Sequence, residues 1–487
     1  MSAEFEDRQA TAGGDSPPEV NEPISTSSDL EQAKKRAAEA FYAQGNVGTT
    51  QIFVNQLGSM NLGPQLKPDA SAKPPADQTY ALDNRKDCTA FVERYQNSEH
   101  LAVAIVLSIF ELVYLGDLPD LKEQLMEELP EAVPAGEDAA PLARNPYISV
   151  DTFLSVIGGE WFTSEEGRQY VGLGTRTQKA LQNLWEQFPA LRDPICRWMV
   201  RLCQNYKART DFDAYQMVCA FARVVSIDFE DAQKRIFARL YSSQRNTGLL
   251  GNLVCKLYGE AGLEKKLEQL LQSWLSSGSN WLWQPACLAC SFLMPKLDEQ
   301  RLAPALEKTI RFRLVHMSRD DSTFLAILLL QSEYFRTLLA RLLCQMVQRA
   351  NGRAERLATA QTYLYLLRSG YYLVDRRQPE LPLAACDTSE QQRFLTPVLA
   401  VVLGQTSLRR QQNVILRAYL EELDHYRCSD RLFDHLCAYF YNMGSAAPDY
   451  RSDILGLLSN CRGSLAQHLR ERLLPLYTSA QRLPSPV

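Results

Sequence analysis

The stretch GLEKKLEQLLQSWLSSGSNWLWQPACLACSFLMPKL, residues 262–297, decides the fold class of the chain. In its first half, Leu267, Leu270, Leu271 and Trp274 recur at the spacing that places side chains on one face of a helix. The turn-forming run SSGSN follows, and the second half is apolar and rich in small residues. The stretch therefore predicts two helices, packed against each other and joined by a short turn.

The same pattern continues from about residue 176 to 478, where amphipathic segments of roughly 12 to 18 residues follow one another, many of them after Asp, Ser or Thr in a capping position. About 16 such segments fit into this range, which gives about 38 residues per helix pair and falls between the periods of tetratricopeptide and HEAT-like repeats. The tetratricopeptide consensus is absent, and no strand–helix alternation competes. We predict an all-α fold with a HEAT-like helical-repeat array (α-solenoid) over residues 147–487.

The pair at 262–297 resembles, in its order of helix, Trp, small polar turn, Trp and Ala-rich helix, the helical repeat arrays of bacterial NTPase-type conflict proteins (antiphage, NLR-like). Such arrays usually accompany a nucleotide-binding core. The motif GxxxxGK[ST] of that core occurs nowhere in this chain. The resemblance therefore implies a partner component, or a relative without the nucleotide-binding core, in a defence or signalling complex.

The N-terminal part has a different composition. Residues 1–86 are poor in aliphatic side chains and rich in Pro, Ser and charge, so we expect them to be mostly disordered, with a short helix at 29–44. Residues 87–146 predict a helical hairpin domain followed by a linker, and YVGLGTRTQK, residues 170–179, is interpreted as the connection into the array.

One β-prone segment interrupts the N-terminal region. GNVGTTQIFVNQLGSMNLG, residues 45–63, has no charge and no proline, and strand-forming residues occupy its centre. We predict a tethered docking element that contacts a partner through Ile52, Phe53, Val54 and Leu57. Two alternatives stay open, which are an internal strand that covers the helices and self-assembly through amide ladders.

Charge, hydropathy and cysteine content indicate the compartment in which the chain is expected to occur. Residues 1–150 carry 24 acidic and 11 basic side chains, whereas the rest of the chain carries a net positive charge of 8. The longest apolar run, residues 101–116, contains Glu111 and predicts a buried helix rather than a membrane span. The first ten residues resemble no secretory signal, and most of the twelve cysteines fall in apolar helical patterns. We predict a cytoplasmic protein with reduced thiols and no membrane partner.

Two groups of residues resemble reactive sites without meeting their geometry. His425, Cys428, His435 and Cys437 are zinc-ligand types, but positions 435 and 437 of one helix project about 200° apart, which opposes a shared ion. The CLAC pair, Cys287 and Cys290, lies in an apolar helix and is interpreted as buried. We predict no metal, no cofactor and no catalytic residue, and metal binding by the His/Cys group stays an open question.

Aromatic and basic side chains are the better candidates for contacts with a partner. Indoles flank the turn of the 262–297 pair and serve either as interface anchors or as core between repeats, and pairs of arginines recur along the array. The predicted array contacts are Trp274, Trp281 and Trp283, and the arginine pairs Arg311 with Arg313, Arg376 with Arg377, and Arg409 with Arg410.

These features favour a non-enzymatic interaction or adaptor protein, which presents a helical-repeat surface and an N-terminal tethered segment to a protein partner. The alternatives are a nucleic-acid-associated helical-repeat protein, for which no nucleic-acid-reading motif exists, and an enzyme or a regulatory subunit of an enzyme complex. The oligomeric state is left open by the sequence.

Overall fold

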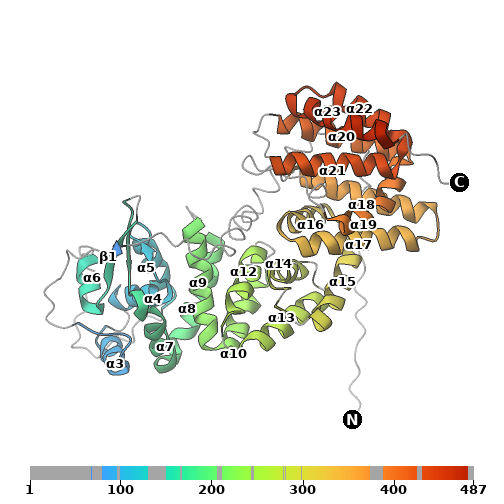
Figure 1. Cartoon of the computed structure of the whole chain (residues 1–487). Coiled ribbons are helices and arrows are strands. Elements are labelled where there is room, and N and C mark those ends of the chain that lie inside the picture. Colours follow the sequence, from blue (N-terminus) through green and yellow to red (C-terminus); the bar gives the residue numbers. More distant parts are fainter. Residues whose placement is uncertain are drawn as a thin grey trace, which may run out of the picture. The chain divides into compact units, whose positions relative to one another are not determined.

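In a computed structural model of the 487-residue chain, the residues that the structure describes form mainly helices, together with one small sheet (Figure 1). The predicted helix at 29–44 and the docking segment at 45–63 lie outside the residues that the structure describes, so both stay predictions. The described residues are 67–68, 79–95, 99–129, 150–164, 167–205, 211–242, 246–260, 262–277, 279, 281–294, 296–297, 299–372, 388–424 and 430–480.

The first helices form where the apolar pattern predicts them. Asn84 caps α3 (Arg85–Arg94), because its side chain accepts the Lys86 amide at 2.9 Å. The apolar run folds as α4 (Glu99–Ile109), which is buried from Leu101 to Ile109 and packs against α5 (Leu118–Met126) and α7 (Thr177–Gln187). No helix of the described residues has the length and apolar character needed to cross a bilayer.

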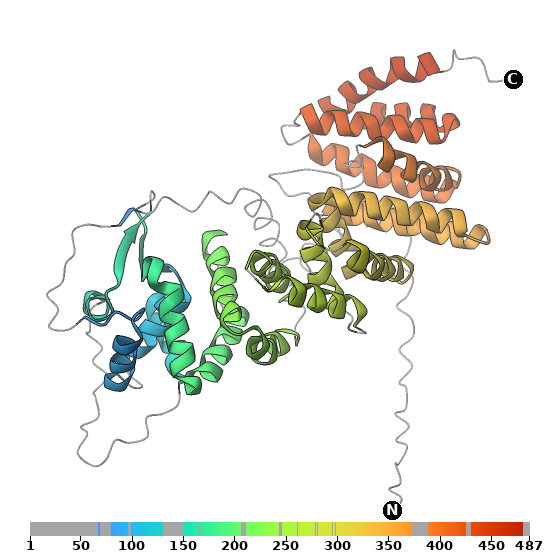
Figure 2. The same cartoon turned by 60° about the horizontal axis from the view of Figure 1, so that its bottom comes forward.

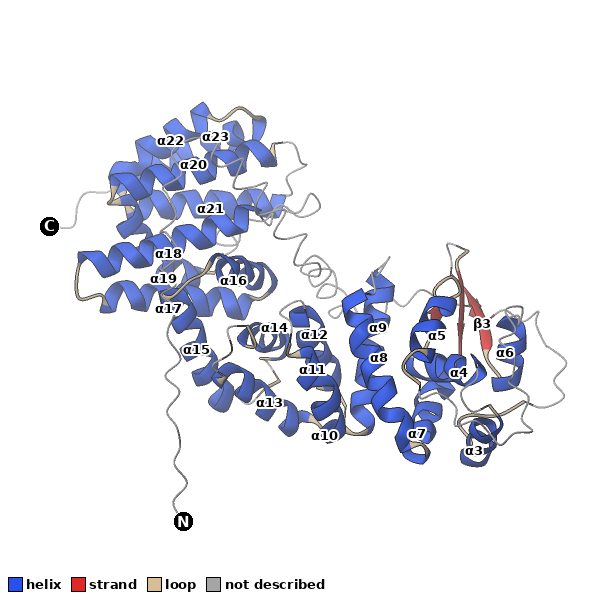
Figure 3. Ribbon diagram, turned by 180° about the vertical axis from the view of Figure 1, so that it is seen from behind, coloured by secondary structure: helices blue, strands red, loops and turns tan. Residues whose placement is uncertain are grey.

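A four-stranded antiparallel sheet is the feature that the sequence did not predict. Its strands run in the order β1–β3–β4–β2, and they appear red in Figure 3. Figure 2 shows the β3–β4 hairpin in teal. In this hairpin, Trp161 pairs with Val171 and Phe162 pairs with Tyr170. The strand bounds are β1 Lys67–Pro68, β2 Val113–Tyr114, β3 Glu160–Thr163 and β4 Gln169–Gly172.

The sheet corrects the interpretation of residues 170–179 as a plain connection, since the first three of them belong to β4. A glycine is needed there, because a Cβ at Gly172 would lie 2.1 Å from the carbonyl oxygen of Glu111 beside β2. Strands of two to four residues are too short to show an alternating pattern in the sequence, which is why they were missed.

Most of the remaining helices of the larger unit follow the sheet in the sequence, whereas α6 precedes β3. Three of them, α10, η3 and α11, form one continuous stretch with a π-helical turn in its middle. Their bounds are α6 Val150–Ile157, α8 Arg192–Asn205, α9 Asp211–Ile227, α10 Phe229–Ala232, η3 Gln233–Phe237, α11 Ala238–Leu240, α12 Thr247–Leu257, α13 Glu264–Ser276, α14 Trp283–Leu293, α15 Glu299–Val315, α16 Arg319–Gln331, α17 Glu333–Arg349, α18 Arg353–Tyr372 and α19 Ser389–Leu403.

Alternate helices of this series contact each other in two layers. One layer contains α12, α14, α16 and α18, and the other contains α13, α15 and α17. Side-chain hydrogen bonds link the second layer across a separation of 34 residues, from Thr309 to the Leu275 carbonyl, from Arg313 to the Ser279 carbonyl and from Arg341 to Glu307. Neighbouring helices are thus packed against one another, and the HEAT-like solenoid with its expected period of about 38 residues stays a prediction.

The chain divides into two compact units, the larger comprising Ala40–Val398 and the smaller containing Leu399–Val487. In the smaller unit α21 packs on α23, where Gly444 faces the Tyr477 ring and the Tyr477 hydroxyl donates to the Phe440 carbonyl at 2.5 Å. The helices of this unit are α20 Thr406–Leu423, α21 Asp430–Ala446, α22 Arg451–Asn460 and α23 Ser464–Ala480.

Candidate functional site

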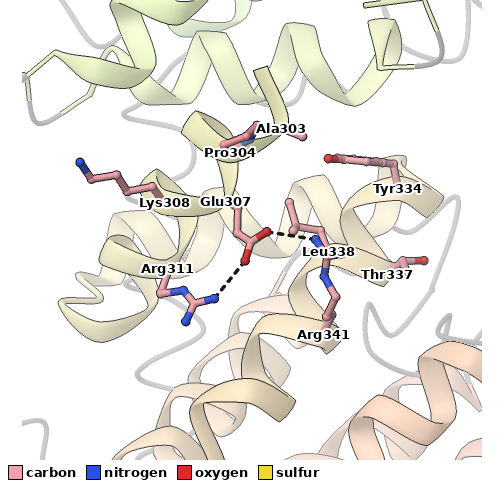
Figure 4. A pocket seen from close by; sticks show the side chains of 9 residues that line it. All are labelled: Ala303, Pro304, Glu307, Lys308, Arg311, Tyr334, Thr337, Leu338 and Arg341. Carbon is pink, nitrogen blue, oxygen red and sulfur yellow. Dashed lines mark hydrogen bonds and ion pairs between the residues drawn. The ribbon is translucent and has the colours of Figure 1, made fainter. Parts of the chain in front are cut away.

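A groove lies between α15 and α17 in the described part of the larger unit (Figure 4). It encloses about 740 Å³ and is open to solvent on one side. A groove of this size accommodates a segment of another molecule. Its lining residues are Ala303, Pro304, Glu307, Lys308 and Arg311 from α15, and Tyr334, Thr337, Leu338 and Arg341 from α17.

On both helices, the residues that line the groove recur at the same sequence spacing. On α15 the lining residues follow Pro304 at intervals of three, four and seven, and on α17 they follow Tyr334 at the same intervals. The start of α17 is fixed by Ser332, whose hydroxyl accepts the Phe335 amide at 3.4 Å and donates to the Ser291 carbonyl at 3.1 Å. The two walls are therefore set by regular helix geometry rather than by loops.

Glu307 occupies the centre of the polar part of the groove. Its carboxylate accepts hydrogen bonds from Arg311 at 3.0 Å and from Arg341 at 3.2 Å, and Figure 4 shows it between the two guanidinium groups. Arg311 also donates to the amide oxygen of Gln345 at 2.5 Å. These contacts hold both arginine side chains in fixed positions across the groove.

The lining carries more positive than negative charge. Lys308, Arg311 and Arg341 contribute three cations, and Glu307 is the one carboxylate among the lining residues. Lys308 is exposed and makes no ion pair within the described part of the chain. Each guanidinium has five N–H donors, of which the bonds to Glu307 use few. The groove thus presents donors and positive charge to an anionic group.

The predicted tryptophan contacts occupy different environments. Trp274 and Trp283 are buried, with 2% and 1% exposure, and Trp281 is half-buried. The Trp274 indole donates to the Tyr241 hydroxyl at 2.9 Å, and the Trp283 ring packs edge-on against Phe324. Burial of the first two favours their interpretation as core between helix pairs over their interpretation as partner anchors.

The predicted arginine pairs are likewise separated. Arg376 and Arg377 lie outside the described residues. In the smaller unit, Arg409 forms an ion pair with Asp453 at 3.2 Å and lies over the Tyr450 ring, whereas Arg410 is exposed. The described cations that gather around one cavity are a different set, Lys308, Arg311 and Arg341.

Of this set, the sequence singled out Arg311 alone. Its predicted companion Arg313 points elsewhere, because its guanidinium lies over the Trp283 ring at 5.3 Å and donates to the Ser279 carbonyl. Lys308 and Arg341 were missed, because the contact of Arg341 with Glu307 joins residues that are 34 positions apart and leaves no local signal in the sequence.

The residues of the His/Cys group cannot be compared as a set, because His425 and Cys428 lie outside the described residues. His435 is buried and Cys437 half-buried, and the described residues contain no group of three metal-ligand types. Ile52, Phe53, Val54 and Leu57 of the predicted docking element also lie outside the described residues.

The CLAC cysteines are buried in α14, as expected. Burial raises the pKa of the Cys290 thiol to about 12 and raises the pKa of the Cys287 thiol well above its usual value. Both thiols stay protonated near neutral pH and are poor nucleophiles there.

Comparison with protein-family models, with curated proteins and with solved structures gave no significant match. The resemblance to the arrays of NTPase-type conflict proteins therefore stays a prediction from pattern.

Proposed function

We propose that this chain is a non-enzymatic interaction protein, built on a HEAT-like helical-repeat array, that binds a protein partner in the α15–α17 groove. The observation that carries the proposal is the excess of cations in that groove, where Lys308, Arg311 and Arg341 outnumber the single carboxylate of Glu307. Guanidinium groups held in place lose little side-chain freedom when they bind, so an acidic partner gains contacts at low entropic cost.

The geometry of the cations favours a protein ligand over nucleic acid. Arg311 and Arg341 converge on the same carboxylate, so their donors are spaced to hold a single carboxylate-sized group. Nucleic-acid grooves instead repeat cations along a backbone and add aromatic stacking platforms. Binding of nucleic acid is the second candidate, and the same experiment tests it.

The test measures binding of fluorescent poly-L-glutamate, single-stranded DNA and duplex DNA to the full chain at two salt concentrations. We expect poly-L-glutamate to bind, and the binding to weaken as salt rises. The double variant Arg311→Ala/Arg341→Ala should weaken it about tenfold or more, within the range for loss of two interface arginines. Arg349→Ala removes an exposed cation from the same helix outside the groove and is the control.

Two results would count against the proposal. If the double variant and Arg349→Ala weaken binding equally, net charge and not the groove attracts the probe. The second result is that either DNA binds more tightly than poly-L-glutamate and that the double variant loses this binding. It would show that the groove binds nucleic acid.

The predicted docking element at 45–63 remains a separate part of this proposal. Replacement of Ile52, Phe53 and Val54 by Ser should remove a partner that is captured by the N-terminal region, and leave binding at the α15–α17 groove unchanged. Loss of both would show that the two regions do not act separately.

A further inference from the structure

The exposed face of α15 continues beyond the groove with apolar side chains. Phe312 and Val315 are 55% and 59% exposed, which is rare for large apolar side chains in the described residues. On the same helix, Phe312 follows Arg311 directly and Val315 lies four residues after it. The groove therefore has an apolar extension at one end.

Helix geometry places this extension in line with the cations. At about 100° per residue, Val315 projects within about 20° of Pro304, between the directions of Lys308 and Arg311. Phe312 lies at the edge of the same face, next to Lys308. The stripe from Pro304 to Val315 extends for about 16 Å, or about three helical turns.

The exposed Phe312 ring is held in a fixed position. The guanidinium carbon of Arg313 lies 5.6 Å from its centroid, and the His316 ring lies 4.7 Å from it. Arg313 is itself anchored by its bond to the Ser279 carbonyl at 3.2 Å and by the Trp283 ring. An aromatic side chain that is exposed and already ordered is suited to bury apolar surface on a partner.

From this arrangement we infer that the ligand of the groove is an acidic amphipathic helix. Its carboxylates bind Arg311, Arg341 and Lys308, and its apolar residues cover Phe312 and Val315. The acidic residues of the ligand are inferred because they complement the cations that line the groove. Its apolar residues are inferred because they would cover the exposed side chains of Phe312 and Val315. This inference rests on the proposed function and specifies the class of partner.

Glu307 has a defined part in this binding. In the free protein its carboxylate already accepts a hydrogen bond from each of the two arginines that the ligand binds. A ligand carboxylate competes with it, so Glu307 lowers affinity and selects ligands that offer more than one carboxylate. Glu307→Gln keeps the shape of the side chain and removes the competing charge.

The experiment measures fluorescence anisotropy with three synthetic peptides of equal length and equal net charge. The first is an amphipathic helix with Glu on one face and Leu and Phe on the other. The second has the same residues in a shuffled order that destroys the two faces, and the third replaces Leu and Phe by Ser. Each is titrated with the wild-type chain, Glu307→Gln, Phe312→Ser/Val315→Ser, Arg311→Ala/Arg341→Ala and the control Arg349→Ala.

We expect the first peptide to bind about tenfold or more tightly than the other two. Phe312→Ser/Val315→Ser should remove this preference and leave binding of the Ser peptide unchanged. Glu307→Gln should tighten binding of all three peptides severalfold. Both apolar residues are exposed, so their replacement should leave the helical fold intact, which circular dichroism checks.

The outcomes separate this inference from the proposed function. Equal binding of the three peptides, with loss in Arg311→Ala/Arg341→Ala, would overturn the amphipathic helix and leave the acidic groove in place. Equal binding of all peptides to that double variant and to the wild-type chain would overturn both. A Glu307→Gln variant that binds less tightly would contradict the competing role of Glu307.

Discussion

The two helical layers of the larger unit differ in how they are held together. Between α12 and α14 the contact is apolar and close, because Gly251 lies directly against Leu288, and Cys287 and Cys290 are fully buried in α14. Between α15 and α17 the contact includes a cavity, crossed by the ion pair of Glu307 with Arg341. One layer is packed as core, whereas the other keeps charge and space at its surface.

This difference suggests a division of roles within one fold, in which the apolar layer provides stability and the α15–α17 layer provides the binding surface. Close packing makes every core side chain costly to change, and partly exposed ion pairs contribute little to the free energy of unfolding. The α15–α17 layer can therefore vary its residues for a partner without a large loss of stability. The following predictions test that separation.

Trp283→Ala should cause the largest destabilisation. Its ring is 1% exposed and packs against Phe324 and Arg313, so truncation leaves a cavity and should lower the free energy of unfolding by about 3–5 kcal/mol. Urea denaturation followed by circular dichroism measures the change. Trp281→Ala, at the half-buried neighbour, is the control and should cost less. Equal losses would mean that Trp283 is not a core residue.

Gly251→Val should follow in size. A Cβ at this position would lie 2.6 Å from the Leu288 Cδ2 atom and 3.0 Å from its Cβ, so α12 and α14 must move apart. We expect a loss of about 1–3 kcal/mol by thermal or urea unfolding. Gly259→Val is the matched control, because a Cβ there has no heavy atom within 4 Å. If both variants lose the same amount, the close approach of α12 and α14 is not what matters.

The layout of these layers shows how much the sequence could predict. The helix pair predicted in residues 262–297 is present as α13 (Glu264–Ser276) and α14 (Trp283–Leu293), because the apolar period of this stretch is strong. The sheet was missed because pairing between distant short strands leaves no local pattern. Half of the groove was missed for a related reason, since Arg341 joins Glu307 through a contact across 34 residues.

Alkaline pH should destabilise the fold, in part through the buried thiols of the apolar layer. The pKa of the Cys290 thiol is raised by burial from about 9 to about 12. Between these values the unfolded chain loses the proton and the folded chain keeps it, so stability is full below pH 9 and falls above it, by up to about 1.4 kcal/mol per pH unit and thiol. Urea midpoints at pH 7.5, 9 and 10.5 measure the slope. Replacement of both CLAC cysteines by Ala should reduce the slope, and an unchanged slope would assign it to other groups.

Glu307→Gln should have the smallest effect on stability. The side chains of Glu307 and Arg311 are about a third exposed and that of Arg341 is more so, which limits the loss to about 1 kcal/mol or less, and added salt should reduce it further. Urea unfolding at low and high salt measures it. A loss as large as that of Gly251→Val would show that the ion pairs hold α15 and α17 together. In that case the charged layer is part of the core, and the groove could not exchange Glu307 for a ligand carboxylate without loosening the array.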